Sequence, residues 1–436
     1  MSENFQAPRG TRDFLPEEMI KREFVINKLK KIFESYGFSP IETPAFENFE
    51  LLAAKGGGGE AIKDQIYYFR DKNDRELGLR FDLTVPLARI VVANNPQLSK
   101  PFKRYCIGRV WRYEEIRKDR FREFWQCDVD TVGSMSMEAD TEIISIAVDS
   151  LQSLDFKKFS VKLNNRKILT GLIDLINVSQ EKKFDIFRAI DKLDKFGRDT
   201  VKKELEQIGL TDEQIKKLLK LITLEGNSKD AIKKGEESLR NIKIGMEGLK
   251  ELNEIVNFSK AYGFDDKIII DFSLARGLDY YTGPIFEIID TSGKNIGSLA
   301  GGGRYDNLIE ILGGRSTPAT GISLGIERII EVMNEEKMLK ISKTKVKVYI
   351  ANVNEEVKKE VIKLASKLRE NGIFCQTDLM NRNLKKQLEY ADALEIPFVV
   401  IIGPEELKKN KVKLKDMVLN KEMEVKTEDL VRKIKG

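Results

Sequence analysis

Two neighbouring segments, FKRYCIGRVWRYE (102–114) and FREFWQCDVDTVG (121–133), decide the fold of this chain. Both are rich in β-prone and aromatic residues, and the EIRKDR stretch between them is highly charged. This pattern predicts two antiparallel strands joined by a solvated tip. Because successive strand residues point to opposite faces of a sheet, we expect the hairpin to direct one set of its side chains onto a common floor.

The hairpin carries side chains of the types that can bind anions or stack on rings. They are Arg109, Trp111 and Arg112 before the tip, and Arg120, Arg122, Phe124 and Gln126 at its end or beyond it. A guanidinium group can hold a phosphate bidentately, and an aromatic ring can stack on a base. A charged hairpin on the protein surface is the alternative interpretation.

Sequence patterns typical of helices and of strands precede and follow the hairpin. Apolar residues recur at helical spacing in 17–36 and 137–154, and the pattern over 76–92 predicts a strand followed by a helix. Residues 181–262 are helix-like and rich in Lys and Glu, which indicates a helical insertion before the β-pattern returns. Beyond a linker near 337–345, strands alternate with helices as in an α/β domain.

Three further motifs concentrate groups that a ligand could use. ARGLDYYTG (275–283) places Arg, Asp, Tyr and Thr beside apolar strands, which is costly to bury without a partner, although an ordinary turn would also explain it. AGGGRYD (300–306) permits close approach to the backbone, but most glycine runs are turns. In GISLGIER (321–328), Arg328 should lie early in a helix and favour a polyphosphate; an ordinary surface arginine is the alternative.

The 436-residue chain contains no histidine, and this absence restricts its chemistry. It excludes a Ser-His-Asp triad, a Cys-His pair and a histidine-ligated zinc site. Any catalysis must therefore use Arg, Lys, carboxylates, Tyr, backbone dipoles or bound ions. Cys106, Cys127 and Cys375 are far apart and odd in number, which favours a reduced cytoplasm over a disulfide framework.

Positive charge is concentrated at the C-terminal end. The net charge is +5, and residues 340–436 contain 22 Lys/Arg and 15 Asp/Glu. A basic terminal domain is compatible with nucleic acid, and a solvated surface without a partner fits equally well. No apolar run approaches the ~20 residues of a membrane span, so we expect no membrane partner.

Taken together, the motifs resemble the histidyl-tRNA synthetases, which are class II aminoacyl-tRNA synthetases. RGLDYYTG is the stretch that is specific to this family. The matching pieces follow the family's order along essentially the full chain: RGTRDFLP (9–16), LRFDLTVPLAR (79–89), the RYE of the hairpin (112–114), ARGLDYYTG, AGGGRYD, GISLGIER and DLMNRNLKKQLEYAD (378–392).

The resemblance implies an α+β fold of the class II type, with an antiparallel sheet flanked by helices. It implies a catalytic core at 1–168 and 261–335, interrupted by a helical insertion at 169–260. A C-terminal α/β anticodon-binding domain would follow at 343–436. A cytoplasmic homodimer is expected.

The implied reaction joins L-histidine and ATP to histidyl-adenylate and then transfers histidine to tRNA(His). Its nucleophile is the substrate's own carboxylate, which is ionised at neutral pH and needs no general base. Charge develops around the α-phosphate, so fixed cations matter most. The resemblance places the catalytic Arg276 and Arg112 at the α-phosphate and Arg328 at the γ-phosphate.

The resemblance also implies the binding contacts. Adenine would meet Glu114 and Phe124, and Mg²⁺ would accompany ATP, held largely by the phosphates, with its protein ligands left unassigned. Residues 343–436 and the 114–120 loop would bind tRNA(His). The implied histidine contacts are Asp82 and Thr84 at the amino group, Gln126 at the carboxylate, Asp130 and Tyr281 at the imidazole, and Tyr280 and Tyr305 completing the pocket.

Two rival interpretations and some departures from the family remain. The rivals are a non-catalytic regulatory subunit of the histidine biosynthetic phosphoribosyltransferase and another class II synthetase. The regulatory paralogues usually lack the anticodon-binding domain and degrade RGLDYYTG, and the other synthetases lack ARGLDYYTG. The tip 115–119 is idiosyncratic, and Tyr113 and Trp125 stand where relatives often have histidine.

Overall fold

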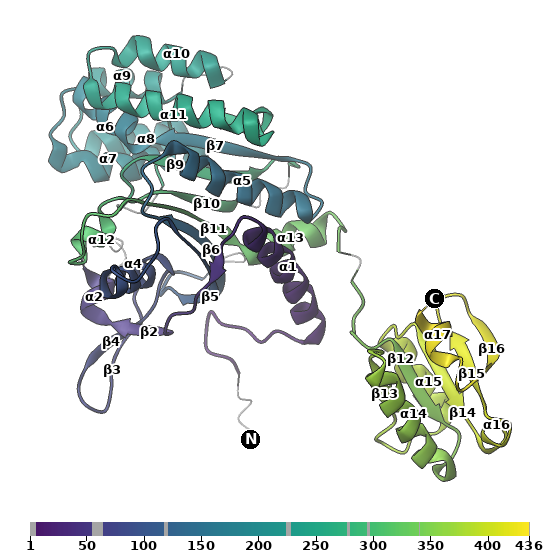
Figure 1. Ribbon diagram of the computed structural model, residues 1–436. Helices are drawn as coiled ribbons and strands as arrows, with labels where there is room; N and C mark the ends of the chain where they lie inside the picture. The colour runs from purple at the N-terminus through teal and green to yellow at the C-terminus, as the bar shows by residue number, and fades with distance from the viewer. Residues whose placement is uncertain are drawn as a thin grey trace. The chain divides into compact units, whose positions relative to one another are not determined.

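The computed structural model describes residues 6–54, 64–116, 121–223, 228–276, 280–293, 297–339 and 341–435. It divides into two compact units that share no sheet (Figure 1). The first comprises Met1–Arg12 and Val25–Met338, and the second comprises Asp13–Phe24 and Leu339–Gly436. The domain limits drawn from the sequence remain predictions. Among the described residues, no helix has the length and apolar content needed to cross a bilayer.

An eight-stranded sheet with the order β1-β5-β6-β11-β10-β9-β7-β8 forms the first unit. The strand pairs in the interior of this sheet are antiparallel. The two edge strands are parallel to their neighbours: β1 pairs with β5, and β8 pairs with β7. The strands are β1 (Ser39–Pro40), β5 (Phe102–Trp111), β6 (Glu123–Val132), β7 (Phe159–Asn165), β8 (Ile268–Ile270), β9 (Pro284–Asp290), β10 (Ser298–Arg304) and β11 (Ala319–Gly325). The expected α+β fold and its hairpin are confirmed, because β5 and β6 pair antiparallel over their full lengths.

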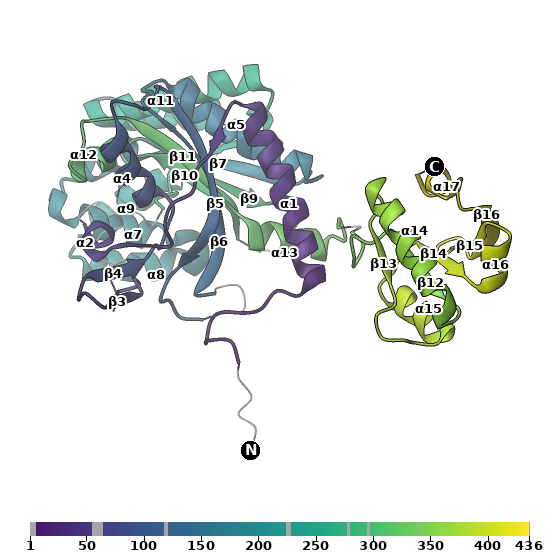
Figure 2. The same ribbon diagram turned by 60° about the horizontal axis from the view of Figure 1, so that its bottom comes forward.

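Helices and a second, smaller sheet surround these strands (Figure 2). The small sheet has the order β2-β4-β3. Its strands are β2 (Phe46–Asn48), β3 (Tyr68–Arg70) and β4 (Glu76–Leu79). The helices outside the insertion are α1 (Pro16–Ser35), of which Val25–Ser35 belong to this unit, α2 (Phe49–Ala53), α4 (Thr84–Asn94), α5 (Met137–Ser153), α12 (Leu308–Ile311) and α13 (Ile326–Glu335). The end of α1 meets α5, where the Tyr36 hydroxyl donates to Asp149 Oδ2 at 2.6 Å.

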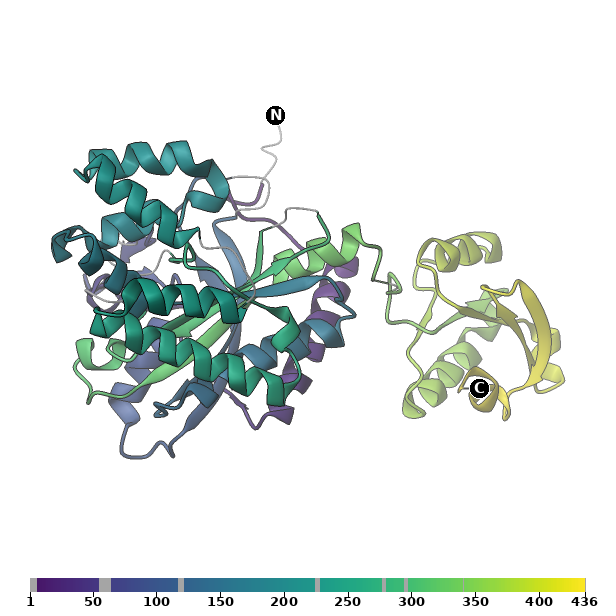
Figure 3. The ribbon, with the colours of Figure 1, turned by 90° about the horizontal axis from the view of Figure 1, so that it is seen from above.

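The helical insertion gathers over the β7–β9 side of the large sheet, in teal in Figures 1 and 3. Close packing of α11 on α6 needs glycine, because a Cβ on Gly171 would lie 2.9 Å from the Cα of Gly245. The helices are α6 (Arg166–Leu175), α7 (Lys183–Ile190), α8 (Leu193–Gln207), α9 (Asp212–Ile222), α10 (Ser228–Leu239) and α11 (Lys243–Tyr262), with short 3-10 turns at Gln180–Lys182 and Asp265–Lys267.

The second unit has a five-stranded sheet with the order β13-β12-β14-β15-β16. Alternate residues of β12 enter two apolar clusters, with Val348 and Ile350 on one face and Tyr349 and Ala351 on the other. Its elements are β12 (Val348–Asn352), a 3-10 turn (Glu355–Val357), α14 (Lys358–Glu370), β13 (Cys375–Thr377), α15 (Leu384–Ala393), β14 (Phe398–Ile402), α16 (Pro404–Lys408), β15 (Lys411–Asp416), β16 (Lys421–Lys426) and α17 (Leu430–Lys435).

Candidate active site

The strand β6 provides the floor of the candidate site. Gln126, Asp128 and Asp130 alternate along it and therefore share one face. All three line the same cavity. Each faces a residue of β5 and a residue of β11: Gly108 and Gly325 for Gln126, Cys106 and Ser323 for Asp128, and Arg104 and Gly321 for Asp130.

Two cavities meet at this floor. The smaller has a volume of about 320 Å³, and every residue predicted to bind histidine lines it: Asp82, Thr84, Gln126, Asp130, Tyr280, Tyr281 and Tyr305. The larger has a volume of about 500 Å³, and every residue predicted to bind ATP lines it: Arg112, Glu114, Phe124 and Arg328. The cavities are contiguous because they share lining residues: Arg112, Glu114, Gln126, Arg276, Gly301 and Ser323.

Asp130 lies at the centre of a buried polar cluster. Its Oδ2 is 2.7 Å from Nη2 of Arg104, and the Tyr305 hydroxyl donates to its Oδ1. Burial raises the pKa of Asp130, and the charge of Arg104 and the Tyr305 hydrogen bond oppose that rise. A Cβ on Gly321 would lie 1.9 Å from Asp130 Oδ1, so only glycine leaves room for this carboxylate.

Asp82 and Asp128 are buried carboxylates of the smaller cavity. Asp82 Oδ1 accepts the N–H of Val85 at 3.0 Å, which fixes it at the start of α4. Burial raises the pKa of Asp82 to about 6 and that of Asp128 to about 7; Arg104 opposes the rise at Asp128, and nearby Asp130 adds to it. Among the described residues, Asp82 Oδ2 and Asp128 Oδ1 have no hydrogen-bond donor, so the cavity offers carboxyl oxygens as acceptors to a ligand.

Ser323 determines which end of the Gln126 amide faces the cavity. When Asp128 is ionised it can only accept, so the Ser323 hydroxyl donates to it. Ser323 Oγ therefore accepts from Nε2 of Gln126, at 3.2 Å. Gln126 Oε1 is buried, and no donor to it exists among the described residues. Gln126 thus presents an acceptor.

Arg112 and Arg328 bring positive charge to the larger cavity. Arg112 leaves β5 at its end, and its Nε donates to the carbonyl of Phe81 at 3.0 Å. Its guanidinium carbon lies 5.2 Å from the centre of the Phe124 ring, which directs it over the cavity wall. Arg328 lies in the first turn of α13 and donates to the carbonyl of Ser298 at 3.0 Å. The N-terminal field of α13 adds to the attraction for anions.

Arg276 lies where the two cavities meet, with its side chain 22% exposed. Its Nη1 is 3.9 Å from Oε1 of Glu287 on β9. Its backbone is left-handed, with φ 59°. The next residues, 277–279, which include Asp279 of the motif, lie outside the described residues.

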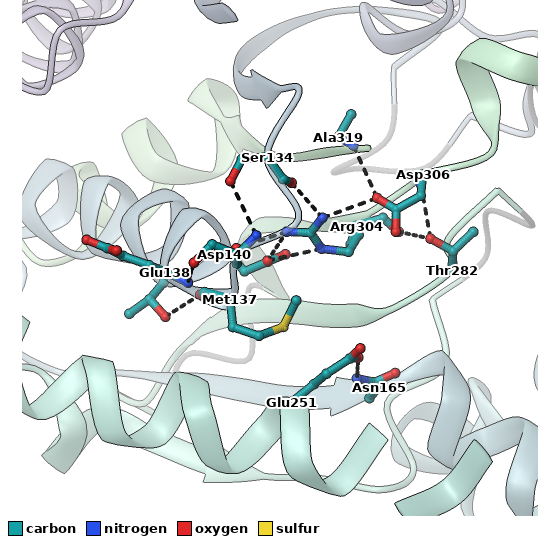
Figure 4. A network of polar contacts seen from close by, with 12 residues as sticks. Ser134, Met137, Glu138, Asp140, Asn165, Glu251, Thr282, Arg304, Asp306 and Ala319 are labelled. Atoms are coloured by element: carbon teal, nitrogen blue, oxygen red, sulfur yellow. Dashed lines mark hydrogen bonds and ion pairs between the residues drawn. The ribbon is translucent and has the colours of Figure 1, made fainter. Parts of the chain in front are cut away.

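Arg304 of AGGGRYD supports the cavity from behind and does not line it. Figure 4 shows its guanidinium between Asp140 of α5 and Asp306. Asp306 in turn accepts the N–H of Ala319 and donates its own N–H to Thr282 Oγ1 at 3.0 Å. The network therefore ties the ARGLDYYTG segment to β10, β11 and α5.

Some predicted residues lie apart from the cavities or outside the described chain. Arg109 and Trp111 both bind Glu123 and line neither cavity. Arg120 and most of the 114–120 loop fall outside the described residues. Within the described chain, no group of three Cys, Asp or Glu side chains converges as a metal site.

The sequence-based prediction missed Arg104, Asp128 and Ser323. The signal for Asp128 was present in the alternation of QCDVD, because a residue between Gln126 and Asp130 on the same face must share their environment. The places of Ser323 and Arg104 beside the floor residues could be found only from the structure, because they depend on the registers in which β11 and β5 pair with β6.

Both the sequence and the fold of this chain are similar to those of known proteins. The family model for histidyl-tRNA synthetase matches residues 10–329, and the model for an anticodon-binding domain matches residues 347–436. A histidine–tRNA ligase of Korarchaeum cryptofilum is 42% identical over 96% of both chains. The crystal structure of a histidyl-tRNA synthetase from a Nostoc species is 33% identical, with a TM-score of 0.86 and 99% coverage of both chains.

The regulatory rival is represented by a more distant structure. A Bacillus halodurans protein described as an ATP phosphoribosyltransferase regulatory subunit/histidyl-tRNA synthetase has a TM-score of 0.75 and 22% identity. It covers 92% of this chain, and this chain covers 99% of it. At that identity the likeness shows a shared fold alone.

Proposed function

The chain belongs to the histidyl-tRNA synthetase family and attaches L-histidine to tRNA(His), and from this premise we propose how its two cavities perform the reaction. The proposal rests on the way in which acceptors and arginines are distributed between the two cavities. Acceptors gather in the smaller cavity, whereas arginines line the larger cavity and the junction. Histidine occupies the smaller cavity, and ATP occupies the larger one.

The ammonium group of histidine binds the acceptors on the floor. Its three N–H donors match the oxygen atoms of Asp82, Gln126 and Asp128 that have no donor among the described residues. Thr84 lines the same cavity and contributes a hydroxyl. The resemblance assigned Gln126 to the carboxylate of histidine, but the orientation that Ser323 imposes favours the ammonium group instead.

The imidazole of histidine binds at the buried polar cluster around Asp130. Asp130 accepts one ring N–H, and the Tyr281 hydroxyl meets the other ring nitrogen. Tyr305 holds Asp130 in place, and Tyr280 packs against both Tyr281 and Tyr305, with ring centres 4.8 and 5.8 Å away. A site that leaves buried groups unpaired when either ring nitrogen is missing rejects analogues by ~10⁴–10⁵.

Adenylate formation takes place at the junction. A carboxylate oxygen of histidine attacks the α-phosphorus of ATP, the bond to the bridging oxygen breaks, and pyrophosphate leaves. The attacking carboxylate is already ionised, so no protein group needs to remove a proton. Arg112 and Arg276 line both cavities and stabilise the negative charge on the oxygens of the α-phosphoryl group.

ATP is held along the larger cavity. Phe124 stacks on the base and Glu114 accepts from the exocyclic amino group, while Arg328 binds the γ-phosphate. Mg²⁺ accompanies the phosphates, which supply most of its ligands. Glu327 is the other carboxylate that borders this cavity, and a carboxylate is a donor type that suits Mg²⁺ and would supplement the phosphate oxygens.

Transfer to tRNA follows adenylate formation. The terminal ribose hydroxyl of tRNA(His) attacks the adenylate carbonyl and releases AMP. The basic residues 343–436 bind the anticodon end of tRNA, and the 114–120 loop, of which 117–120 lie outside the described residues, binds the acceptor end. A cytoplasmic location is part of the proposal.

The functional molecule is a homodimer. Support comes from exposed aromatic rings on the small sheet of the first unit. Phe46 and Phe69 are 51 and 38% exposed with ring centres 6.2 Å apart, and exposed apolar side chains that gather in this way are typical of an interface. Sedimentation of the purified chain is expected to give twice the mass of one chain; a monomer at all concentrations would contradict this part.

Charging of tRNA tests the proposed function. The full chain is incubated with ATP, Mg²⁺, labelled histidine and a tRNA(His) transcript, with a transcript for another amino acid as the control. We expect histidine on tRNA(His) alone. If histidine is not attached to tRNA(His), the proposal fails.

A further inference from the structure

The backbone of Arg276 is held from both sides by side chains that are distant in sequence. Its N–H donates to Asp191 Oδ1 at 2.8 Å, across 85 residues. Its carbonyl accepts from Arg166 Nη2 at 3.1 Å, across 110 residues. Two charged side chains thus fix the donor and the acceptor of the same residue, which lies at the junction of the cavities.

This clamp holds a conformation that Arg276 would not choose alone. A φ of 59° is left-handed, a region that residues with a side chain seldom occupy. Such a conformation persists only where its surroundings impose it, and it is frequent at active sites. The left-handed backbone fixes the direction in which the Arg276 side chain leaves the main chain.

Both clamping residues connect Arg276 to the helical insertion. Asp191 directly follows α7, and Arg166 opens α6. The guanidinium carbon of Arg166 lies 4.8 Å from the centre of the Phe187 ring of α7. The backbone N–H of Arg166 donates to the carbonyl of Gly283 at 2.9 Å, so it also holds the end of ARGLDYYTG.

The charge of Asp191 acts on the Arg276 side chain as well. Desolvation by burial lowers the pKa of Arg276, but Tyr281, Glu287 and Asp191 raise it on balance. Asp191 therefore has two effects that can be separated. It supplies an oxygen to the Arg276 N–H, and it supplies a negative charge.

We infer that Asp191 and Arg166 are positioning residues that set the place of the catalytic Arg276, and that the insertion bears on adenylate formation through them. The inference rests on the proposed role of Arg276 in that step. Asp191 touches no predicted substrate position and lines neither cavity. Movement of α7 would carry Asp191 with it and release the Arg276 N–H.

Histidine-dependent ATP–pyrophosphate exchange tests this inference in the full chain. Asp191→Ala removes the acceptor and is expected to lower kcat by about 10- to 100-fold, more than it changes either KM, because small misplacements at a reacting centre are costly. Asp191→Asn keeps an oxygen acceptor without the charge and should restore most of the rate. The matched control is Glu204→Gln, which alters the ion pair of the adjacent Lys192 and should leave exchange unchanged.

A double-mutant cycle separates positioning from a purely structural role. In an Arg276→Lys background, Asp191→Ala should cause little further loss, because the group that it positions is already changed. A fully additive loss, or wild-type exchange by Asp191→Ala alone, would overturn the inference and leave the role of Arg276 intact. Wild-type exchange by both Arg276→Lys and Arg276→Ala would instead overturn the proposed role of Arg276, and the inference with it.

Discussion

Gly301 leaves the space that the guanidinium of Arg276 fills, since a Cβ on Gly301 would lie 1.6 Å from Arg276 Nη1. Gly301 lies on β10, and Arg276 follows β8, three strands away in the sheet order. Two motifs that are separate in the sequence, ARGLDYYTG and AGGGRYD, are therefore parts of one site. The first supplies a cation, and the second supplies room for it.

Replacing Arg276 by Ala should abolish most adenylate formation without unfolding the protein. Loss of one donor that acts on developing charge typically costs about 10²–10³ in rate. Histidine-dependent ATP–pyrophosphate exchange measures this loss, and circular dichroism checks the fold. Exchange near the wild-type rate would remove Arg276 from the mechanism.

Gly301→Ala should reproduce much of the same loss. The new methyl group occupies the site of the guanidinium, and the flexible end of Arg276 moves rather than the strand. The melting temperature should change little, because the displaced group is a side-chain terminus at a cavity. An active Gly301→Ala enzyme would show that Arg276 does not need this position.

Asp130→Asn should raise the KM for histidine by about 10- to 100-fold, as expected for weakening a hydrogen bond to a charged group. Stability should fall too, because Arg104 loses its buried counter-charge. Asp149→Asn is a matched control, since Asp149 lies on α5, accepts from the Tyr36 hydroxyl and lines neither cavity. An unchanged KM in Asp130→Asn would contradict the imidazole assignment.

Asp128 should make the stability of the ligand-free protein depend on pH. Burial raises its pKa from 3.8 to about 7, so the folded state binds this proton more tightly than the unfolded state. That contribution to stability is complete below pH 3.8 and is lost as the pH rises through about 7. The unfolding temperature should therefore fall as the pH rises from about 4 to 7, and Asp128→Asn should flatten the slope over that range. An equal slope in the variant would refute this assignment.

Local patterns were sufficient to predict much of the fold. The two strands of the hairpin were predicted because aromatic and β-branched residues flank a charged tip, and the structure has β5 and β6 there. The helices around 17–36 and 137–154 follow from apolar spacing and appear as α1 and α5. The hairpin of β15 and β16 was not predicted, because β16 is mostly exposed and only Val425 in it is buried.

The site required information beyond local pattern. Motif resemblance placed Asp82, Gln126 and Asp130 together, and all three line one cavity. The orientation of Gln126 depends on Ser323, 197 residues away, and the clamp on Arg276 depends on Asp191 of the insertion. No spacing in the sequence encodes such contacts, because they arise from the order of strands and the packing of α7.

The absence of histidine from the chain agrees with this chemistry. The substrate carboxylate is its own nucleophile, and the polar groups at the junction are arginines. Neither role requires a group that titrates near neutral pH. Imidazole enters the proposed site only as part of the substrate.

ATP–pyrophosphate exchange with each of the twenty amino acids tests the central claim most directly. The purified chain, with ATP, Mg²⁺ and labelled pyrophosphate but no tRNA, should form labelled ATP with histidine and with no other amino acid. Exchange without dependence on histidine, or faster exchange with another amino acid, would contradict the claim that these cavities activate histidine.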